Sequence, residues 1–228
     1  MRRALIVGAS RGIGLGLTRE HLERGWHVTA TLRSPSSDLE ALADKMGAKL
    51  AIERVDITKP NDVVGLAARL EGQVFDLIFL NAGIMVGRGM PLVDVPDDDI
   101  VSLVITNAFS PVRAADRLIG RAAKGATIAF MSSVLGSVST NDDGRAELYR
   151  ASKAALNSLI LSFRARYRDR GDFTILAVHP GVVRTSMGGP DAPLEISESV
   201  KGVTDMLEKR FGTGGAAFVN YRNEIIPW

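Results

Sequence analysis

Short apolar stretches, rich in β-branched and aliphatic residues, alternate along this chain with longer stretches of helical periodicity. The short stretches predict seven strands, at Arg3–Val7, His27–Leu32, Lys49–Asp56, Phe75–Leu80, Ala126–Met131, Phe173–His179 and Ala216–Asn220. The longer stretches predict helices at Ile13–Arg24, Leu39–Met46, Pro60–Leu70, Asp97–Ala123, Tyr149–Arg170 and Ser197–Arg210. Because strand and helix alternate strictly, the pattern indicates an α/β fold with one doubly wound parallel sheet and helices on both of its faces.

Two of the predicted helices, Asp97–Ala123 and Tyr149–Arg170, are apolar around most of their circumference. A helix that packs on a sheet normally turns a polar face to water, so a helix that is apolar on nearly all sides needs a second cover. The simplest cover is another copy of the chain. The pattern therefore predicts a homodimer or homotetramer, with residues such as Phe163 on the outward face.

The composition narrows the functional classes. The 228 residues suit a single domain that spans 1–228. The chain has no cysteine, which excludes disulfides, thiolate metal sites and thiol nucleophiles and favours a cytoplasmic location. The net charge of +2, with acids and bases interleaved, gives no nucleic-acid footprint, and no apolar run approaches the ~18 residues of a membrane span. The three histidines have no partners at ligand spacing, so no metal site is expected.

A glycine-rich segment, GASRGIG at Gly8–Gly14, follows the first predicted strand and opens the first predicted helix. Glycines in such a turn let the backbone approach a pyrophosphate, whose charge is stabilised at the helix N-terminus. The spacing Gly-x-x-x-Gly-x-Gly differs from the general dinucleotide fingerprint, and the glycines could serve only to shape a turn. The strand-turn-helix context favours a dinucleotide site in a Rossmann-type fold.

The residue after the second predicted strand helps to select the dinucleotide. An acidic residue there would bind a ribose hydroxyl, whereas a basic residue accommodates the 2′-phosphate of NADP. Arg33 takes that position, and Arg11 in the glycine loop adds a second cation. Asp38 is interpreted as a cap of the helix that begins at Leu39. The sequence therefore favours NADP(H), with NAD(H) possible; the alternative is that Arg33 is an exposed loop arginine.

Tyr149 and Lys153, four residues apart in YRASKAAL, lie on one face of a predicted helix. Tyrosine ionises near pH ~10, and a cation about 4 Å away would favour the phenolate by roughly 4 kcal/mol at an effective dielectric near 20. This pair therefore predicts a proton-transfer site. The same spacing also occurs in helices where the tyrosine packs and the lysine is solvated.

Seven motifs in order resemble those of the short-chain dehydrogenase/reductase family, and the resemblance extends over essentially the whole chain. They are GASRGIG, Asp56-Ile57, Asn81-Ala82-Gly83, Asn107, Ser132-Ser133, Tyr149-x-x-x-Lys153 and HPGVVRT from His179 to Thr185. The resemblance implies a catalytic set of Asn107, Ser133, Tyr149 and Lys153. In this set Tyr149 protonates a carbonyl oxygen that Ser133 holds, Lys153 lowers the tyrosine pKa and binds the nicotinamide ribose, and Asn107 anchors a water that links the lysine to solvent.

The resemblance also implies the contacts of the dinucleotide. The glycine loop would bind the pyrophosphate, Asp56 the adenine and Asn81 the adenosine ribose side, and Val182 and Thr185 would contact the nicotinamide carboxamide. With the two arginines, the expected cofactor-binding set is Gly8, Ser10, Arg11, Gly12, Ile13, Gly14, Arg33, Asp56, Ile57, Asn81, Ala82, Gly83, Tyr149, Lys153, Pro180, Gly181, Val182 and Thr185.

Three features depart from the family pattern. Val7 and Leu80 stand where the family commonly has a threonine and an asparagine, so apolar packing is expected to replace a polar link between the first and fourth strands. The stretch STNDDGRAE between Ser133 and Tyr149 is predicted to be a loop beside the substrate mouth. The region Thr185–Ile196 has little room for lid helices, which predicts an open site.

These observations predict an NADP(H)-dependent oxidoreductase that reduces a ketone, aldehyde or quinone to an alcohol. The expected substrate wall is apolar and consists of Ile84, Met85, Val134, Leu135, Leu148, Val182 and Met187, which suits a small hydrophobic substrate. The alternative is a dinucleotide-binding signalling or sensor protein with incidental catalysis. A pure sensor has no physical need for the tyrosine phenol, so the complete catalytic set favours an enzyme.

Overall fold

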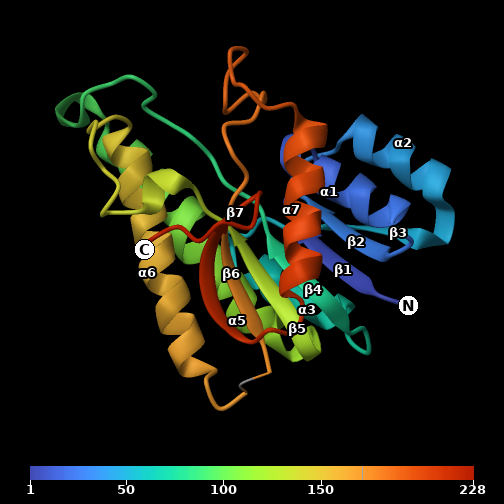
Figure 1. Cartoon of the computed structure of the whole chain (residues 1–228). Coiled ribbons are helices and arrows are strands. Elements are labelled where there is room, and N and C mark those ends of the chain that lie inside the picture. Colours follow the sequence, from blue (N-terminus) through green and yellow to red (C-terminus); the bar gives the residue numbers. More distant parts are fainter. Residues whose placement is uncertain (171) are drawn as a thin grey trace.

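A parallel seven-stranded sheet runs through the centre of the molecule, in the computed structural model that describes residues 1–170 and 172–228 (Figure 1). The strand order is β3-β2-β1-β4-β5-β6-β7. The strands are β1 (Arg3–Val7), β2 (His27–Leu32), β3 (Leu50–Arg54), β4 (Phe75–Leu80), β5 (Ala122–Met131), β6 (Thr174–His179) and β7 (Gly215–Asn220). The predicted fold class is confirmed, and the predicted bounds of β1, β2 and β4 are those observed.

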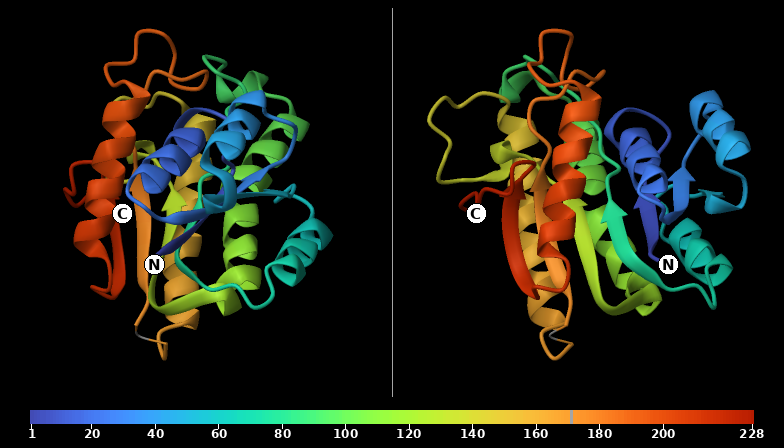
Figure 2. Two further views of the ribbon diagram at one scale, coloured as in Figure 1. Left: turned by 90° about the vertical axis from the view of Figure 1, so that its right-hand side faces the viewer. Right: turned by 45° about the vertical axis from the view of Figure 1, so that its right-hand side comes forward.

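Helices cover both faces of the sheet (Figure 2). They are α1 (Gly12–Glu23), α2 (Ser37–Met46), α3 (Pro60–Arg69), α4 (Asp97–Val104), α5 (Ser110–Leu118), α6 (Glu147–Arg166) and α7 (Ile196–Arg210). One apolar cluster joins one face of the sheet to α3, α5 and α6, and a second joins the other face to α1, α2 and α7. Alternate side chains of a strand enter opposite clusters, as Leu5 and Ile6 of β1 do, because the pleat turns them to opposite faces.

The chain changes direction across the sheet between β1 and β4. From β1 the connections lead to β2 and β3 on one side, whereas β4, β5, β6 and β7 follow on the other. Both strands end at this point, β1 at Val7 and β4 at Leu80, so the loops that follow them leave the sheet in opposite directions. In doubly wound sheets such a point is where ligands bind.

The predicted helix Asp97–Ala123 is observed as one helical stretch, but it contains a π turn and it ends before Ala122. The structure divides it into α4, a π-helical turn at Ile105–Phe109, and α5, and β5 already begins at Ala122. The π turn widens the helix where Asn107 bonds the backbone of the neighbouring loop, a local contact that helical periodicity does not encode.

Two further predictions are wrong, one on the residue that caps α2 and one on the face of α6 that is buried. Ser36, not Asp38, caps α2, because its Oγ accepts a hydrogen bond from the Leu39 N–H at 3.3 Å. Phe163 of α6 does not face outward: it is fully buried against Phe130, with ring centroids 5.8 Å apart. Periodicity shows that α6 is apolar on several sides but not which side meets the sheet.

Within the described ranges, no helix combines the length and the apolar character that a bilayer crossing requires.

Candidate active site

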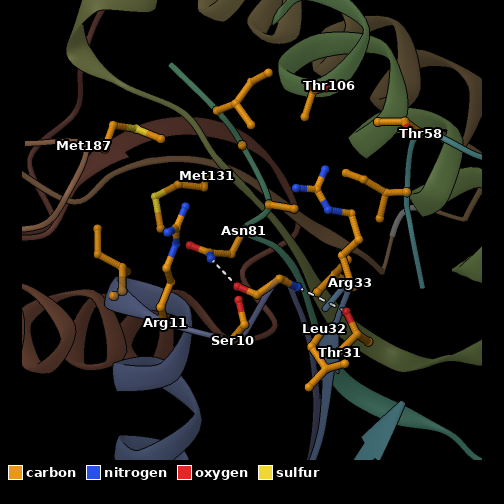
Figure 3. A pocket seen from close by; sticks show the side chains of 18 of the residues that line it. Ser10, Arg11, Thr31, Leu32, Arg33, Thr58, Asn81, Thr106, Met131 and Met187 are labelled. Atoms are coloured by element: carbon orange, nitrogen blue, oxygen red, sulfur yellow. Dashed lines mark hydrogen bonds between the residues drawn. The ribbon is translucent and has the colours of Figure 1, made fainter. Parts of the chain in front are cut away.

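A cleft lies over the carboxyl ends of the central strands and extends from the glycine loop to the start of α6 (Figure 3). Its lining joins segments that are far apart in the sequence. The residues are Val7, Gly8, Ser10–Ile13, Thr31–Arg33, Val55–Thr58, Asn81–Ile84, Thr106, Met131, Tyr149, Lys153 and Thr185–Met187. Most of the predicted cofactor-binding residues are therefore brought together in one cleft, along with the predicted proton donor and its lysine.

The glycine loop is pressed against the end of β4. A Cβ on Gly8 would lie 2.8 Å from Ala82, and a Cβ on Gly14 would lie 2.1 Å from the Gly8 carbonyl oxygen, so larger residues at either position would clash with backbone. Gly8 also has φ +90°, a conformation that favours glycine. The loop consequently brings the N-terminus of α1 to the cleft, where the helix dipole and backbone N–H groups suit a pyrophosphate.

Hydrogen bonds fix this loop to both neighbouring strands. The Asn81 side chain donates to the Gly8 carbonyl oxygen at 2.7 Å, and the Gly8 N–H donates to Thr31 Oγ1 at 3.1 Å; Figure 3 shows both bonds. The expectation that apolar packing replaces the polar link between β1 and β4 is therefore wrong in part. Val7 and Leu80 are buried apolar residues, but Asn81 makes the polar link one position later.

Two arginines add positive charge to the cleft. Arg11 and Arg33 both line it, from the start of α1 and the end of β2, and Figure 3 shows both side chains directed toward the cavity. Neither forms an ion pair with a carboxylate of the described residues. Two cations beside a ribose site suit a 2′-phosphate, because a doubly charged anion there would be paired instead of repelled.

Asp56 lines the cleft near Arg33. Partial burial opposes its ionisation, but hydrogen bonds from the Thr58 N–H at 3.0 Å and the Thr58 hydroxyl at 2.7 Å, with the nearby Arg33 charge, hold the pKa of the carboxyl below its usual value. Asp56 is thus a fixed anion that can accept a hydrogen bond from an adenine amino group. Thr58 was not predicted as a site residue, because a threonine two positions after an aspartate is an ordinary turn pattern.

Tyr149 and Lys153 occupy the inner end of the cleft, on the first turns of α6. Lys153 Nζ lies 5.7 Å from the centroid of the Tyr149 ring and donates a hydrogen bond to the Met131 carbonyl oxygen at 2.8 Å. The Tyr149 hydroxyl donates to the Met187 sulfur at 3.9 Å. Both side chains lie on one face of α6, as the spacing predicted. They line the same cleft as the glycine loop.

The electrostatics of this pair differ from the sequence expectation. Burial raises the pKa of Tyr149 to about 12 and lowers the pKa of Lys153 to about 8. Burial is thus the dominant influence on both groups, because low-dielectric surroundings penalise the charged form of each, and the pKa of Tyr149 is raised where the sequence predicted it to be lowered. The prediction of a depressed tyrosine pKa treated the pair as if it lay near the surface, whereas Lys153 is almost completely buried.

Asn107 is a buried anchor between α6 and the loop after β4. Its Oδ1 accepts from the Ile84 N–H at 2.8 Å, and its Nδ2 donates to the Ile84 carbonyl oxygen at 2.9 Å and to Ser152 Oγ at 3.2 Å. Ser152 in turn donates to the Tyr149 carbonyl oxygen at 2.8 Å. A Cβ on Gly83 would lie 3.2 Å from Asn107 Oδ1 and 3.8 Å from Lys153 Nζ, so the amide and the ammonium flank one glycine.

Ser133 begins a short turn that packs directly on α6. Its Oγ accepts from the Leu135 N–H at 3.2 Å, and the turn is held to α6 by the Asn157 side chain, which donates to the Gly136 carbonyl oxygen at 3.1 Å and accepts from Ser132 Oγ at 2.7 Å. A Cβ on Gly136 would come within 2.9 Å of Lys153, which requires glycine at this contact. Ser133 and Asn107 do not line the main cleft, although both are fixed against the helix that carries Tyr149 and Lys153.

The segment after β6 contributes less to the cleft than predicted. Thr185 lines it, but Pro180, Gly181 and Val182 do not, and Val182 is 53% exposed. The Pro180 carbonyl oxygen accepts from Ser199 Oγ at 2.6 Å, which ties the turn to α7. This part of the motif acts in the structure as a bridge between β6 and α7.

The expected apolar wall is also only partly present. Ile84 and Met187 line the cleft, whereas Leu148 turns away into a separate cluster with Val95 and Leu103. The region Thr185–Ile196 contains no helix before α7, as expected, and Met187 of this region lies over the Tyr149 hydroxyl. The sequence could not indicate this cover, since it depends on where a glycine-rich loop folds.

Comparisons with known proteins agree with this geometry. The family model described as short chain dehydrogenase matches residues 2–193. A short-chain dehydrogenase/reductase of Burkholderia multivorans, solved with bound NADP, is 43% identical; the match covers 100% of this chain and 99% of that chain, with a TM-score of 0.97. A carbonyl reductase of Pseudomonas aeruginosa PAO1, in complex with NADP, is 39% identical over 100% of both chains, with a TM-score of 0.92.

A third similar protein is C-signal. The C-signal of Myxococcus xanthus is 36% identical over 155 residues, which make up 67% of this chain and 92% of that protein. The family model covers most of the chain, and the sheet order, glycine loop and Tyr149–Lys153 pair agree with the match. The chain belongs to the short-chain dehydrogenase/reductase family.

Proposed function

We propose that this chain is an NADP(H)-dependent oxidoreductase that reduces a ketone, aldehyde or quinone to an alcohol, with the single domain 1–228 both binding the dinucleotide and supplying the acid. One observation carries the proposal: Tyr149 and Lys153 lie in the same cleft as the glycine loop and the arginine pair. The NADP-bound carbonyl reductase of Pseudomonas aeruginosa supports it as a similar protein.

The residues of the cleft suit a dinucleotide in an extended position. The glycine loop at the N-terminus of α1 would hold the pyrophosphate, Arg11 and Arg33 the 2′-phosphate, Asp56 the adenine, and Lys153 the nicotinamide ribose. The chemistry that the dinucleotide supplies when bound is hydride transfer to the carbonyl carbon. NAD(H) could occupy the same cleft without using the arginine pair.

Tyr149 is the proton donor in this proposal. Its raised pKa keeps the phenol protonated at neutral pH, which is the form that a reduction requires. The carbonyl oxygen becomes an alkoxide as the reaction proceeds, and an alkoxide is far more basic than a phenolate, so the proton moves to it favourably. Ser133 would hold the same oxygen by a hydrogen bond.

Lys153 would stabilise the phenolate that remains after this transfer. The attraction between an ammonium and a phenolate is large in a buried site, because little solvent screens it. The hydrogen bond from Lys153 to the Met131 carbonyl oxygen orients the ammonium beside the ring. The buried Asn107 would hold the water through which Lys153 and Tyr149 are reprotonated.

A signalling or sensor protein with incidental catalysis is the second candidate, and the similarity to C-signal favours it. Both candidates bind the dinucleotide, so binding alone does not separate them. Turnover of NADPH with a panel of apolar ketones, aldehydes and quinones does. We also propose a cytoplasmic location, in agreement with the lack of cysteine.

We further propose that the chain forms a homodimer or homotetramer through the outer faces of α4, α5 and α6. Three apolar side chains project there: Val101 is 59% exposed, Phe109 37% and Leu161 39%. Small exposed residues on α6, Ala151 and Ser158 among them, would let a second helix approach closely. A layer of this kind, related by a two-fold axis, would bury the same residues of both copies.

Replacing Tyr149 with Phe tests the proton donor. NADPH binding should survive, whereas turnover with the best substrate of the panel should fall by about 10² to 10⁴ or more, because the general acid is lost. The control is Tyr167→Phe, since the Tyr167 hydroxyl bonds Asp116 outside the cleft. Turnover of the Tyr149 variant within a few-fold of wild type would exclude this residue as the donor.

Arg33→Ala tests the cofactor choice. Loss of a charge-assisted pair with the 2′-phosphate should weaken NADPH binding about ten- to a hundredfold and leave NADH binding nearly unchanged. Titration of nucleotide fluorescence measures both constants, and Arg19→Ala, an exposed arginine of α1 outside the cleft, is the control. Equal weakening of both nucleotides would show that Arg33 is structural.

Lys153→Met should increase stability at pH 7 while abolishing activity. The folded-state pKa of Lys153 is lowered from 10.5 to about 8, so below pH 8 the folded protein carries a buried charge that costs about 3 kcal/mol at 1.36 kcal/mol per unit. Between these two pKa values only the unfolded chain stays protonated, so the cost disappears as the pH rises.

The expected advantage of the Met variant is thus greatest at pH 7 and small near pH 10. Urea unfolding at both pH values measures it, with the exposed Lys49→Met as the control that should show no such trend. A Met variant less stable than wild type at pH 7 would mean that the ammonium is stabilised in the folded protein.

Leu161→Glu tests the assembly. An uncompensated carboxylate is costly to bury, so this variant should dissociate or lose cooperativity of assembly, whereas Val64→Glu on α3 should not. Light scattering at micromolar concentration measures both. A monomeric wild type would refute the proposed interface.

A further inference from the structure

Two loops meet over the Tyr149 hydroxyl. One connects β4 to α4 and the other connects β6 to α7, and Figure 2 shows both at the same end of the molecule. Arg88 of the first loop donates from Nη2 to the Met187 carbonyl oxygen of the second at 2.5 Å. The Met187 sulfur accepts the Tyr149 hydroxyl hydrogen bond at 3.9 Å. The contacts thus form a chain from Arg88 through Met187 to the reactive phenol.

The tip of the second loop is a defined turn with Met187 inside it. Thr185 Oγ1 accepts from the Gly188 N–H at 3.0 Å, and the Thr185 carbonyl oxygen accepts from the Gly189 N–H at 2.9 Å. A Cβ on Gly188 would lie 1.8 Å from the Val183 carbonyl oxygen, so the turn requires glycine there. The base of the loop is held by Arg184, which bonds Ala192 and Glu195. Met187 therefore reaches the phenol from a turn whose shape is fixed by these contacts.

Arg88 bonds this turn from a segment whose backbone allows it to move. It stands between Gly87, with φ +61°, and Gly89, with φ +75°, so the backbone on each side has the conformation of a glycine hinge. Among the described residues its guanidinium forms no ion pair, and its hydrogen bond goes to a neutral carbonyl. This bond is exposed to solvent, which can replace it, so it can break at moderate cost.

We propose that Arg88 is a positioning residue that holds the Met187 thioether on the Tyr149 hydroxyl, so that a substrate must displace Met187 before its carbonyl oxygen can accept the phenol proton. This inference rests on the proposed role of Tyr149 as donor. A thioether is a weak acceptor and a carbonyl oxygen a stronger one, so the exchange favours the carbonyl once the loop opens. The fraction of molecules with Met187 displaced then scales the apparent affinity for substrate.

The position of Met187 can be tested without any catalysis. In protein labelled with ¹³C at the methionine methyl groups, Arg88→Ala should shift and sharpen the Met187 signal, because the thioether leaves the Tyr149 hydroxyl. Arg88→Lys should restore the shift in part, and Arg19→Ala should leave it unchanged. A Met187 signal identical in wild type and Arg88→Ala would overturn the proposal, whether or not a substrate is known.

The consequence for substrate is tested by kinetics at saturating NADPH. Arg88→Ala should lower KM by about three- to tenfold, the effect of one hydrogen bond of modest strength, and change kcat by less than about twofold. In a Met187→Ala background the same Arg88→Ala change should have no effect on KM, because the thioether to be displaced is gone. An equal effect in both backgrounds, or a rise in KM, would show that Arg88 acts on the substrate directly and would overturn the proposal.

Discussion

The contact between the glycine loop and the end of β4 determines the rest of the site. Gly8 and Gly14 bring backbone within a distance that no side chain tolerates, and the Asn81 amide bonds the Gly8 carbonyl oxygen at 2.7 Å. This contact sets the N-terminus of α1 relative to the loop Asn81–Ile84. Because that loop is bonded in turn to Asn107, which donates to Ser152 of α6, the position of the glycine loop is coupled to the position of α6.

The end of the cleft that holds Tyr149 and Lys153 is built as a buried polar network. Asn107, Ser152 and the Tyr149 carbonyl oxygen form a hydrogen-bonded chain, and the turn after Ser133 is fixed to α6 through Asn157. The network fixes rotamers and backbone, so the phenol and the ammonium hold their positions at the cost of desolvation. The pKa values of Tyr149 and Lys153 move in opposite directions for that one reason. The desolvation cost of a buried ammonium is typical of sites that give up stability for function.

The cover over the phenol adds a second layer to this arrangement. Met187 lies at the tip of a turn whose glycines and threonine determine its shape. Arg88 reaches it from a loop that lies 99 positions earlier in the chain. The cleft thus has Tyr149, Lys153 and Met187 at its inner end and the charged side chains of Arg33 and Asp56 at the other. This difference suits a ligand with a charged phosphate end and an uncharged reactive end.

The sequence by itself determined the α/β fold, the bounds of several strands and the residues that the cleft collects. Strand periodicity and the order of the motifs are local properties, and a parallel sheet necessarily brings the ends of its strands to one edge. The π turn at Asn107, the buried face that contains Phe163, the burial of Lys153 and the cover by Met187 were decided only by the tertiary structure. Each of these depends on contacts between segments distant in the chain. The pKa of a buried group depends on how completely other elements exclude water from it, and no spacing along the chain encodes that exclusion.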